Sequence, residues 1–147
     1  MDLQLTDKLA LITGSTAGIG YAIAEALAAE GASVILNGRS QGSVDAAIAK
    51  LSTGVPGKVL GFAGDLSTTE AAAALVEKYP NVEILVNNLG IFEATPFDEI
   101  TDDDWRRFFE INVLSGVRLS RLYLPSMKAR NWGRIVFISS ESGVQIP

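Results

Sequence analysis

The sequence predicts an α/β protein built on a doubly wound parallel sheet, with helices covering both faces. Short apolar runs alternate with longer segments of helical spacing along the chain. This alternation is typical of parallel strands joined by right-handed helical crossovers. The apolar runs are continuous rather than interleaved with polar residues, which indicates strands buried on both faces. No linker or repeat interrupts the pattern, so we expect residues 1–147 to belong to one domain.

Composition limits the classes of function. The 147 residues are 48% hydrophobic and 20% charged, as is typical of a globular domain. The lack of cysteine excludes disulfides and thiolate metal sites, and the lack of histidine removes the commonest metal ligand and general base. A net charge of −5 argues against a nucleic-acid partner. No apolar run is long enough for a membrane span, so we expect no membrane partner and a cytoplasmic protein.

The predicted strands and helices follow one another in alternation. Apolar runs predict strands over 8–13, 33–37, 58–63, 84–86 and 134–138. Helical spacing predicts helices over 18–30, 40–52, 67–79 and 101–130. The third helix is expected to begin with a capping box from Ser67 to Glu70. The fourth is expected to bend or break near Pro125, because proline cannot donate a helical hydrogen bond.

A glycine-rich turn between the first strand and the first helix is the strongest single signal. Its glycines have the spacing Gly-x-x-x-Gly-x-Gly. Glycine permits positive φ and close approach of a ligand, and the free N–H groups of a helix's first turn favour an anion. The turn therefore predicts a phosphate cradle, with cofactor contacts from Gly14, Ser15, Thr16, Gly18, Ile19 and Gly20. The alternative is an ordinary strand-to-helix turn that needs glycine for packing.

Polar residues also follow each of the other predicted strands. They occupy 37–40, 65, 87–90 and 139–143. Ligands of an open parallel sheet bind beyond the carboxyl ends of its strands, near the point where strand order reverses. We therefore expect all five loops to form a single site on one rim of the sheet.

The loop after the second strand bears on the choice of cofactor. An NAD site usually places a carboxylate about twenty residues after the glycines, whereas Gly38 stands at that position here. Arg39 follows, and its planar guanidinium suits the 2′-phosphate of NADP. Ser40 is expected to add a hydroxyl, and Ser15 is a further candidate to face that phosphate. These residues favour NADP(H) over NAD(H), against the alternative of a solvated surface arginine.

The third and fourth loops supply candidates for binding the adenosine. Asp65 and Leu66 fit an adenine pocket, with a carboxylate for the exocyclic amine and an apolar side chain against the ring. The alternative for Asp65 is a helix cap. Asn88 and Gly90 are expected to bring backbone groups against the ribose, while Asn87 ties neighbouring strands together. The alternative for this loop is a purely structural turn.

Asn112 and Ser140 are the candidate catalytic residues. Asn112 lies four residues after Phe108, on the apolar stripe of the long helix, and leaving a buried amide unpaired costs about 1–3 kcal/mol. We expect Asn112 to kink the helix and hold a water for proton relay, or else to bond to backbone structurally. Ser140 follows the fifth strand, where a substrate carbonyl would lie. Without a histidine, it is expected to hydrogen-bond the reacting oxygen rather than act as a nucleophile, unless it is an ordinary turn serine.

Together these residues resemble the short-chain dehydrogenase/reductase family. The matching motifs are Thr-Gly-x-x-x-Gly-x-Gly at 13–20, Asp65, Asn-Asn-Leu-Gly at 87–90, Asn112 and Ser140. The resemblance implies a Rossmann fold and an NADP(H)-dependent oxidoreductase that moves a hydride between the nicotinamide and a carbonyl or secondary alcohol. Leu89 replaces the family's usual alanine, which is expected to alter packing rather than cofactor binding. Glu141 replaces a small or apolar residue, which favours a more polar substrate pocket.

The family's catalytic set also includes a tyrosine and a lysine four residues later. None of Tyr21, Tyr79 and Tyr123 has lysine at that spacing, and the family's tyrosine would lie beyond Pro147. We therefore expect the amino-terminal portion of a single NAD(P)-binding domain, with five strands of a larger sheet, that is inactive alone. The resemblance implies that the full-length protein is a homo-oligomer, provided that it contains the helix expected after the fifth strand, and that it associates through that helix and the long helix. The alternatives left open are a fragment completed by a complementary carboxyl-terminal chain, a truncated gene product, and a non-catalytic dinucleotide-binding or interaction module.

Overall fold

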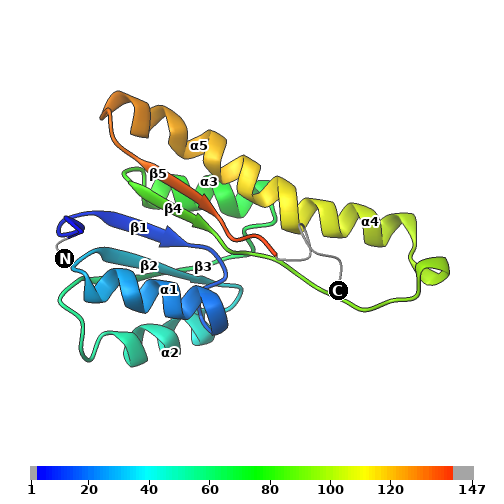
Figure 1. The fold of residues 1–147 in the computed structure, drawn as a ribbon, viewed down its shortest axis with the longest axis horizontal. Helices are drawn as coiled ribbons and strands as arrows, with labels where there is room; N and C mark the ends of the chain where they lie inside the picture. The colour runs from blue at the N-terminus through cyan, green and yellow to red at the C-terminus, as the bar shows by residue number, and fades with distance from the viewer. Residues whose placement is uncertain (1–2, 141–147) are drawn as a thin grey trace.

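A five-stranded parallel sheet forms the centre of the molecule (Figure 1). The structure is a computed structural model, and it describes residues 3–140. The strands are β1 (Leu9–Ile12), β2 (Ser33–Gly38), β3 (Val59–Ala63), β4 (Ile84–Asn87) and β5 (Arg134–Phe137). They lie in the order β3-β2-β1-β4-β5, and every neighbouring pair is parallel. The predicted doubly wound α/β fold is confirmed, and the strand order reverses between β1 and β4.

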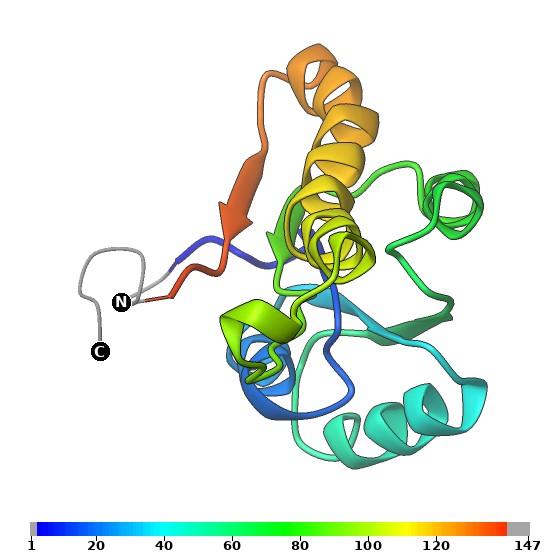
Figure 2. The same ribbon diagram turned by 90° about the vertical axis from the view of Figure 1, so that its right-hand side faces the viewer.

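Helices cover both faces of this sheet (Figure 2). They are α1 (Gly18–Ala29), α2 (Gln41–Leu51), α3 (Thr69–Lys78), α4 (Asp102–Phe109) and α5 (Ser115–Ala129), with short turns η1 (Phe97–Glu99) and η2 (Glu110–Leu114). Side chains alternate along β1: Ala10 and Ile12 pack in the core beneath α1 and α2, whereas Leu11 packs in the core beneath α3 and α5. Because both faces are covered, each strand reads as a continuous apolar run.

The start of α3 differs from the prediction. The N-cap is Thr68, whose side chain accepts a hydrogen bond from the Ala71 N–H at 3.2 Å. The expected cap, Ser67, instead donates its hydroxyl to Asp65 Oδ1 at 2.7 Å. The expectation of a capping box from Ser67 to Glu70 is therefore wrong. The Ser67 hydroxyl is hydrogen-bonded to Asp65, and Thr68 caps the helix instead.

The irregularity in the long helix lies earlier than predicted. A π turn, η2, joins α4 to α5, whereas Pro125 lies within the continuous helix α5. The expected break at Pro125 is wrong. Pro125 is exposed, so water can satisfy the carbonyl that loses its helical partner. The predicted start is correct, since Thr101 and Asp104 form a full capping box at 3.0 and 3.2 Å.

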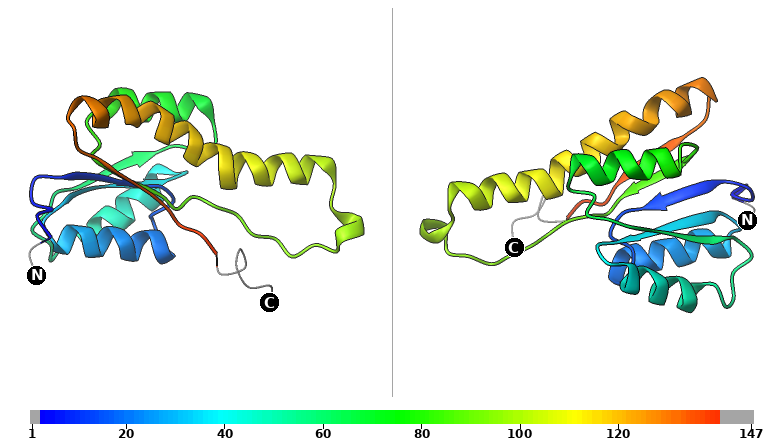
Figure 3. Two further views of the ribbon diagram at one scale, coloured as in Figure 1. Left: turned by 45° about the horizontal axis from the view of Figure 1, so that its top comes forward. Right: turned by 180° about the vertical axis from the view of Figure 1, so that it is seen from behind.

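The segment from Ile91 to Phe109 projects away from the sheet, and we call it the arm. Figure 3 shows it leaving the end of β4 and returning as η1 and α4, beyond the body of the domain. No residue of α4 is buried, and Trp105 and Phe109 are 59% and 55% exposed. Within residues 3–140, no helix has the length and apolar character needed to cross a membrane.

Candidate functional site

The glycine loop between β1 and α1 has the geometry of an anion cradle. Gly14 and Gly18 have φ of +60° and +59°, which other residues rarely adopt. A Cβ on Gly20 would lie 2.5 Å from Asn88 Nδ2 and 2.6 Å from the Gly14 carbonyl oxygen, so only glycine fits there. No side chain caps the first turn of α1 at Ala17, which leaves the turn's N–H groups for a ligand.

Asn37, at the end of β2, holds the glycine loop against the loop after β3. Its Oδ1 accepts from the Gly14 N–H at 3.0 Å, and its Nδ2 donates to the carbonyls of Phe62 and Gly64 at 3.2 and 3.1 Å. The side chain is buried, with 2% of the residue exposed. One amide therefore joins three loops of the rim.

Thr13 and Asn88 hold the glycine loop against the loop after β4. Thr13 Oγ1 accepts from the N–H groups of Asn88 and Leu89 at 2.9 and 2.8 Å. Asn88 Nδ2 donates to the carbonyls of Thr13 and Gly14 at 2.9 and 3.0 Å. The Asn88 side chain thus has the tying role that the sequence suggested for Asn87. Asn87 Nδ2 instead donates to Ser120 Oγ in α5 at 3.3 Å, so its side chain ties the sheet to a helix rather than two strands together.

Ser15 does not face the groove, contrary to the expectation that it meets the ribose phosphate. The residue is 0% exposed. Its hydroxyl donates to the Ile12 carbonyl at 2.6 Å and accepts from the Asn37 N–H at 2.9 Å. Its own N–H donates to the Asn37 carbonyl. Both polar groups of Ser15 therefore stabilise the scaffold beneath the loop.

A groove runs across the rim where four of the predicted loops meet. It is lined by Gly14, Thr16, Ala17, Asn37, Gly38, Arg39, Gly64, Asp65, Leu66 and Leu89. Of the predicted cofactor residues, five share this lining: Gly14, Thr16, Arg39, Asp65 and Leu66. Seven others are not part of it: Ser15, Gly18, Ile19, Gly20, Ser40, Asn88 and Gly90. Of the five loops expected to converge, those after β1, β2, β3 and β4 line this groove, whereas the described residues of the fifth loop, 139–140, do not.

The second loop, which follows β2, places the positively charged side chain of Arg39 at the groove. Arg39 is exposed and forms no ion pair with any residue in 3–140. A Cβ at Gly38 would lie 2.6 Å from Thr16 Cγ2, so this position has no room for a carboxylate side chain. Ser40 is the N-cap of α2, and its hydroxyl accepts from the Ser43 N–H at 3.3 Å. The loop thus favours an anion beside Arg39.

The third loop presents a carboxylate and an apolar wall. Asp65 Oδ1 accepts from Ser67 N–H and Oγ at 3.0 and 2.7 Å. Because the N-cap of α3 is Thr68, the helix-cap alternative for Asp65 is wrong. Asp65 remains exposed at the groove, and Leu66 beside it is 1% exposed. Among residues 3–140, no cluster of three or more carboxylates is arranged to hold a metal ion.

Asn112 lies in the π turn and fastens the start of the arm. Its Oδ1 accepts from the Ile91 N–H at 2.7 Å, and its Nδ2 donates to the Ile91 carbonyl at 3.1 Å. Asn112 is exposed, so the expectation of a buried amide is wrong. The reason is that the arm leaves the sheet and the apolar stripe of α4 stays uncovered. The structural role foreseen for Asn112, bonding to backbone, is the one the structure shows.

Ser140 lies just past β5 on the same rim and is exposed. The chain before it pairs with β4, since the Ile138 N–H donates to the Asn87 carbonyl at 3.0 Å. β5 and β4 are neighbours in the sheet. Ser140, which follows β5, and Asn88, which follows β4, therefore come after the ends of adjacent strands. Glu141 and the rest of the predicted fifth loop lie outside the described residues.

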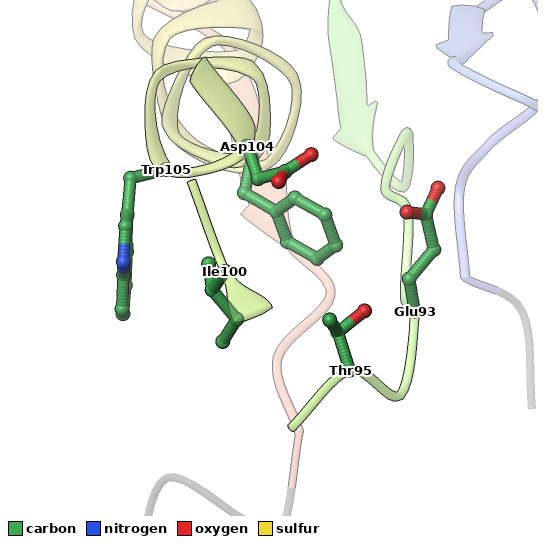
Figure 4. Close-up of a pocket in the computed structure, with 6 residues that line it drawn as sticks. Glu93, Thr95, Ile100, Asp104 and Trp105 are labelled. Atoms are coloured by element: carbon green, nitrogen blue, oxygen red, sulfur yellow. The ribbon is translucent and has the colours of Figure 1, made fainter. Parts of the chain in front are cut away.

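A second cavity lies within the arm, between residues 93–100 and α4, and shares no lining residue with the rim groove (Figure 4). It is lined by Glu93, Thr95, Ile100, Asp104, Trp105 and Phe108. Both carboxylates are engaged. The Arg107 guanidinium hydrogen-bonds Glu93 at 2.6 and 2.9 Å and lowers the pKa of that carboxyl, and hydrogen bonds from Thr101 lower the pKa of Asp104. Both titratable side chains that line this cavity therefore have hydrogen-bond partners. We interpret the cavity as a gap between packed segments of the arm, because it offers no free acid or base.

Comparison with known proteins decides the family. A model of the short chain dehydrogenases matches residues 8–147. The chain belongs to the short-chain dehydrogenase family. It is 54% identical to the oxidoreductase YvrD of Bacillus subtilis (strain 168), over 99% of the chain and 56% of that relative. The chain therefore spans a little over half the length of YvrD.

Solved structures of short-chain dehydrogenases share the fold closely. L-sorbose reductase from Gluconobacter frateurii, complexed with NADPH and L-sorbose, has a TM-score of 0.93 and 38% identity, covering 99% of this chain and 57% of its own. A 7α-hydroxysteroid dehydrogenase complexed with NADH has a TM-score of 0.90 and 32% identity, covering 99% and 58%. Both nicotinamide cofactors therefore occur on this fold, and the choice between them lies in local residues.

Thr13 and Asn37 belong to the sequence motifs of this rim, but the sequence predicted no individual role for either. The Asn37 side chain makes three hydrogen bonds to neighbouring rim segments, and Thr13 Oγ1 accepts two from the loop after β4. A signal existed, since each is the polar residue that ends a continuous apolar strand. A buried polar side chain needs partners, and at a strand's carboxyl end those partners are the neighbouring loops.

Proposed function

We propose that the protein carrying this chain is an NADP(H)-dependent oxidoreductase that transfers a hydride between the nicotinamide and a carbonyl or secondary alcohol. The observation that carries the proposal is the groove in which the glycine loop, the exposed Arg39 and the Asp65–Leu66 wall meet. The family assignment and the NADPH complex of L-sorbose reductase support it. A non-catalytic dinucleotide-binding module is the second candidate, because no tyrosine in the 147 residues has lysine four positions later.

The residues of the groove fit the cofactor's parts. The N–H groups around Gly18 would bind the pyrophosphate, Arg39 the 2′-phosphate, and Asp65 with Leu66 the adenine. Asn88 and Gly90 of the fourth loop would contact the ribose, and Ile19 and Gly20 would complete the turn that holds the pyrophosphate. When bound, the nicotinamide supplies the hydride donor or acceptor.

Two residues are proposed for the chemistry. Ser140 would donate a hydrogen bond to the reacting oxygen, which orients the carbonyl and stabilises charge that develops on it. Asn112 would act through its hold on Ile91, keeping the π turn and the arm in place beside the substrate. A proton donor with an activated hydroxyl is also required, and the family's tyrosine and lysine have no match in this sequence.

Substitution of Arg39 tests the cofactor assignment. We expect the purified chain to bind NADPH more tightly than NADH, and Arg39→Ala to weaken NADPH binding roughly 10- to 100-fold, since a hydrogen bond to a charged group contributes about 1.5–3 kcal/mol. NADH is the matched control, because it lacks the 2′-phosphate and its affinity should not change. Fluorescence titration with both cofactors measures this. Equal loss for both, or no binding of either by the wild type, would contradict the proposal.

We also propose that the protein self-associates through the long helix. Trp105, Phe109, Val113 and Val117 recur every fourth residue, and all four are exposed. Such a contiguous apolar stripe is unusual on a monomer. Light scattering should therefore report an oligomer, and Phe109→Glu should shift it toward monomer. A monomeric wild type would contradict this part of the proposal.

A further inference from the structure

The side chain of Arg118 bridges two parts of the molecule that the chain separates. It arises from α5, and its Nη1 donates to the Ser67 carbonyl in the third rim loop at 2.8 Å. Its Nη2 donates to Glu110 Oε1 at the start of the π turn. The side chain is only 13% exposed. Burying a guanidinium this deeply is unfavourable unless its donors are paired, so both partners stabilise one fixed geometry.

The loop that Arg118 reaches forms one wall of the groove. Ser67 is linked to Asp65 by two hydrogen bonds, and Leu66, which lies between them, is one of the residues that line the groove. The near end of the loop is held by the rim itself, since the Gly64 N–H donates to the Gly38 carbonyl at 2.9 Å. At Ser67 the only side-chain donor from outside the loop, within residues 3–140, is Arg118.

The other end of the bridge is the turn that carries Asn112. Glu110 opens η2, and Asn112 within that turn fastens Ile91 at the start of the arm. Glu110 and Arg118 are eight residues apart, across the π turn, and their paired side chains show that they lie on one face of the long helix. The bridge therefore fixes the distance between the adenosine side of the groove and the turn on the catalytic side.

We propose that Arg118 is a positioning residue for the cofactor groove, which holds the Asp65–Leu66 wall in register with the π turn that carries Asn112. The proposal rests on the proposed function, because it assigns a role toward the nicotinamide dinucleotide. Without the bridge, the Ser67 carbonyl and Glu110 lose a shared partner and the loop samples more conformations. Cofactor binding must then order the loop, and the affinity falls by the fraction of chains in the competent conformation.

Arg118→Gln and a matched control test this role. Arg121 lies one turn along the same helix, is exposed, and forms no ion pair with a residue in 3–140. We expect Arg118→Gln to weaken NADPH binding roughly tenfold, equivalent to about 1.4 kcal/mol, whereas Arg121→Gln should stay within about twofold. Both are measured by titration with NADPH, at a temperature where circular dichroism shows each variant fully folded.

Hydrogen exchange separates positioning from a general loss of stability. Without cofactor, Arg118→Gln should speed amide exchange at Ser67 and Thr68, whose N–H groups bond to Asp65, and leave exchange in β1 unchanged. A merely structural role predicts a lower unfolding temperature with unchanged NADPH affinity, and that result overturns the inference. If Arg118→Gln does not fold, Arg118→Lys serves instead. Its ammonium lacks the planar fork that serves both acceptors, so a loss of several-fold is expected and an unchanged affinity overturns the proposal.

The outcomes distinguish this inference from the function on which it rests. If the wild-type protein binds no NADPH or NADH, the proposed function fails and the role assigned to Arg118 fails with it. If the wild type binds NADPH and Arg39→Ala weakens it, but Arg118→Gln binds as tightly as the wild type, only the inference about Arg118 is overturned.

Discussion

The amide of Asn37 illustrates how a binding rim is built by residues that need not touch the ligand. It satisfies one N–H and two carbonyls from the loops on either side of β2. These backbone groups are at the edge of the core, where an unpaired polar atom costs about 1–3 kcal/mol. The rim is therefore arranged before any cofactor binds, which reduces the ordering cost of binding.

Asn37→Ala should be strongly destabilising. The substitution removes all three side-chain hydrogen bonds, and we expect the free energy of unfolding to fall by about 2–4 kcal/mol. Urea unfolding followed by circular dichroism measures it. Asn81→Ala is the control, because Asn81 is exposed and its loss should change stability by less than about 0.5 kcal/mol. Similar values for the two variants would show that the amide does not organise the rim.

At the scale of elements, the π turn decides where the long helix points. The Ser115 hydroxyl donates to the Ile111 carbonyl at 2.6 Å across this turn. On one side of it Gly116 packs against the sheet, where a Cβ would lie 2.6 Å from Phe137 Cε1. Within the turn itself, the Asn112 side chain hydrogen-bonds the backbone of Ile91 at the start of the arm. A π turn adds one residue to the helical ring, which allows these two contacts to occur on the same helix.

Acid should loosen the arm. Hydrogen bonding to Arg107 lowers the pKa of Glu93 in the folded state, so the pair is stabilising above the unfolded pKa and that stabilisation is lost as pH falls through the lower, folded value. We expect the emission of Trp105, measured in a Trp132→Phe background, to hold steady near neutral pH and to change only below about pH 4.3, the ordinary glutamate value.

Substitution of two arginines in α4 tests whether the Arg107–Glu93 pair causes the change in Trp105 emission. Arg107→Gln removes the partner of Glu93, so the midpoint of the Trp105 transition should move to higher pH. Arg106→Gln is the control, since Arg106 pairs with Asp102 and Asp103 instead, and the wild-type midpoint should remain. An unchanged midpoint in Arg107→Gln would mean that Glu93 does not hold the arm.

For the whole molecule, cofactor binding and turnover should be separable. The groove and its supporting hydrogen bonds lie within the described residues, whereas the sequence contains no tyrosine with lysine four residues on. The mass-verified 147-residue chain should therefore bind NADPH but show no NADPH-dependent reduction of sugars, 3-oxoacyl thioesters, steroids or small ketones. Absorbance at the NADPH band measures turnover, with binding in the same sample as the control. Measurable turnover would contradict the expectation.

Patterns along the sequence predicted the sheet and the glycine loop well, because both depend on local chemistry. Continuous apolar runs require two covered faces, and a Gly-x-x-x-Gly-x-Gly turn before a helix has few other uses. The errors occurred where neighbours compete for one group. Asp65 takes the hydroxyl of Ser67, and Ile12 and Asn37 take the polar groups of Ser15. Such competition is settled by distances that sequence spacing does not contain.

By itself, the sequence determined the doubly wound α/β fold class, the approximate bounds of the five strands, and the glycine-rich turn between the first strand and the first helix. Hydrophobic periodicity and glycine conformation are properties of short segments, so they can be read without coordinates. Only the tertiary structure decided that Asn37, Thr13 and Asn88 hold the rim, that Asn112 is exposed, and that Arg118 bridges Ser67 to Glu110. Those contacts join residues up to 76 positions apart, and they exist only once the strands have been placed side by side.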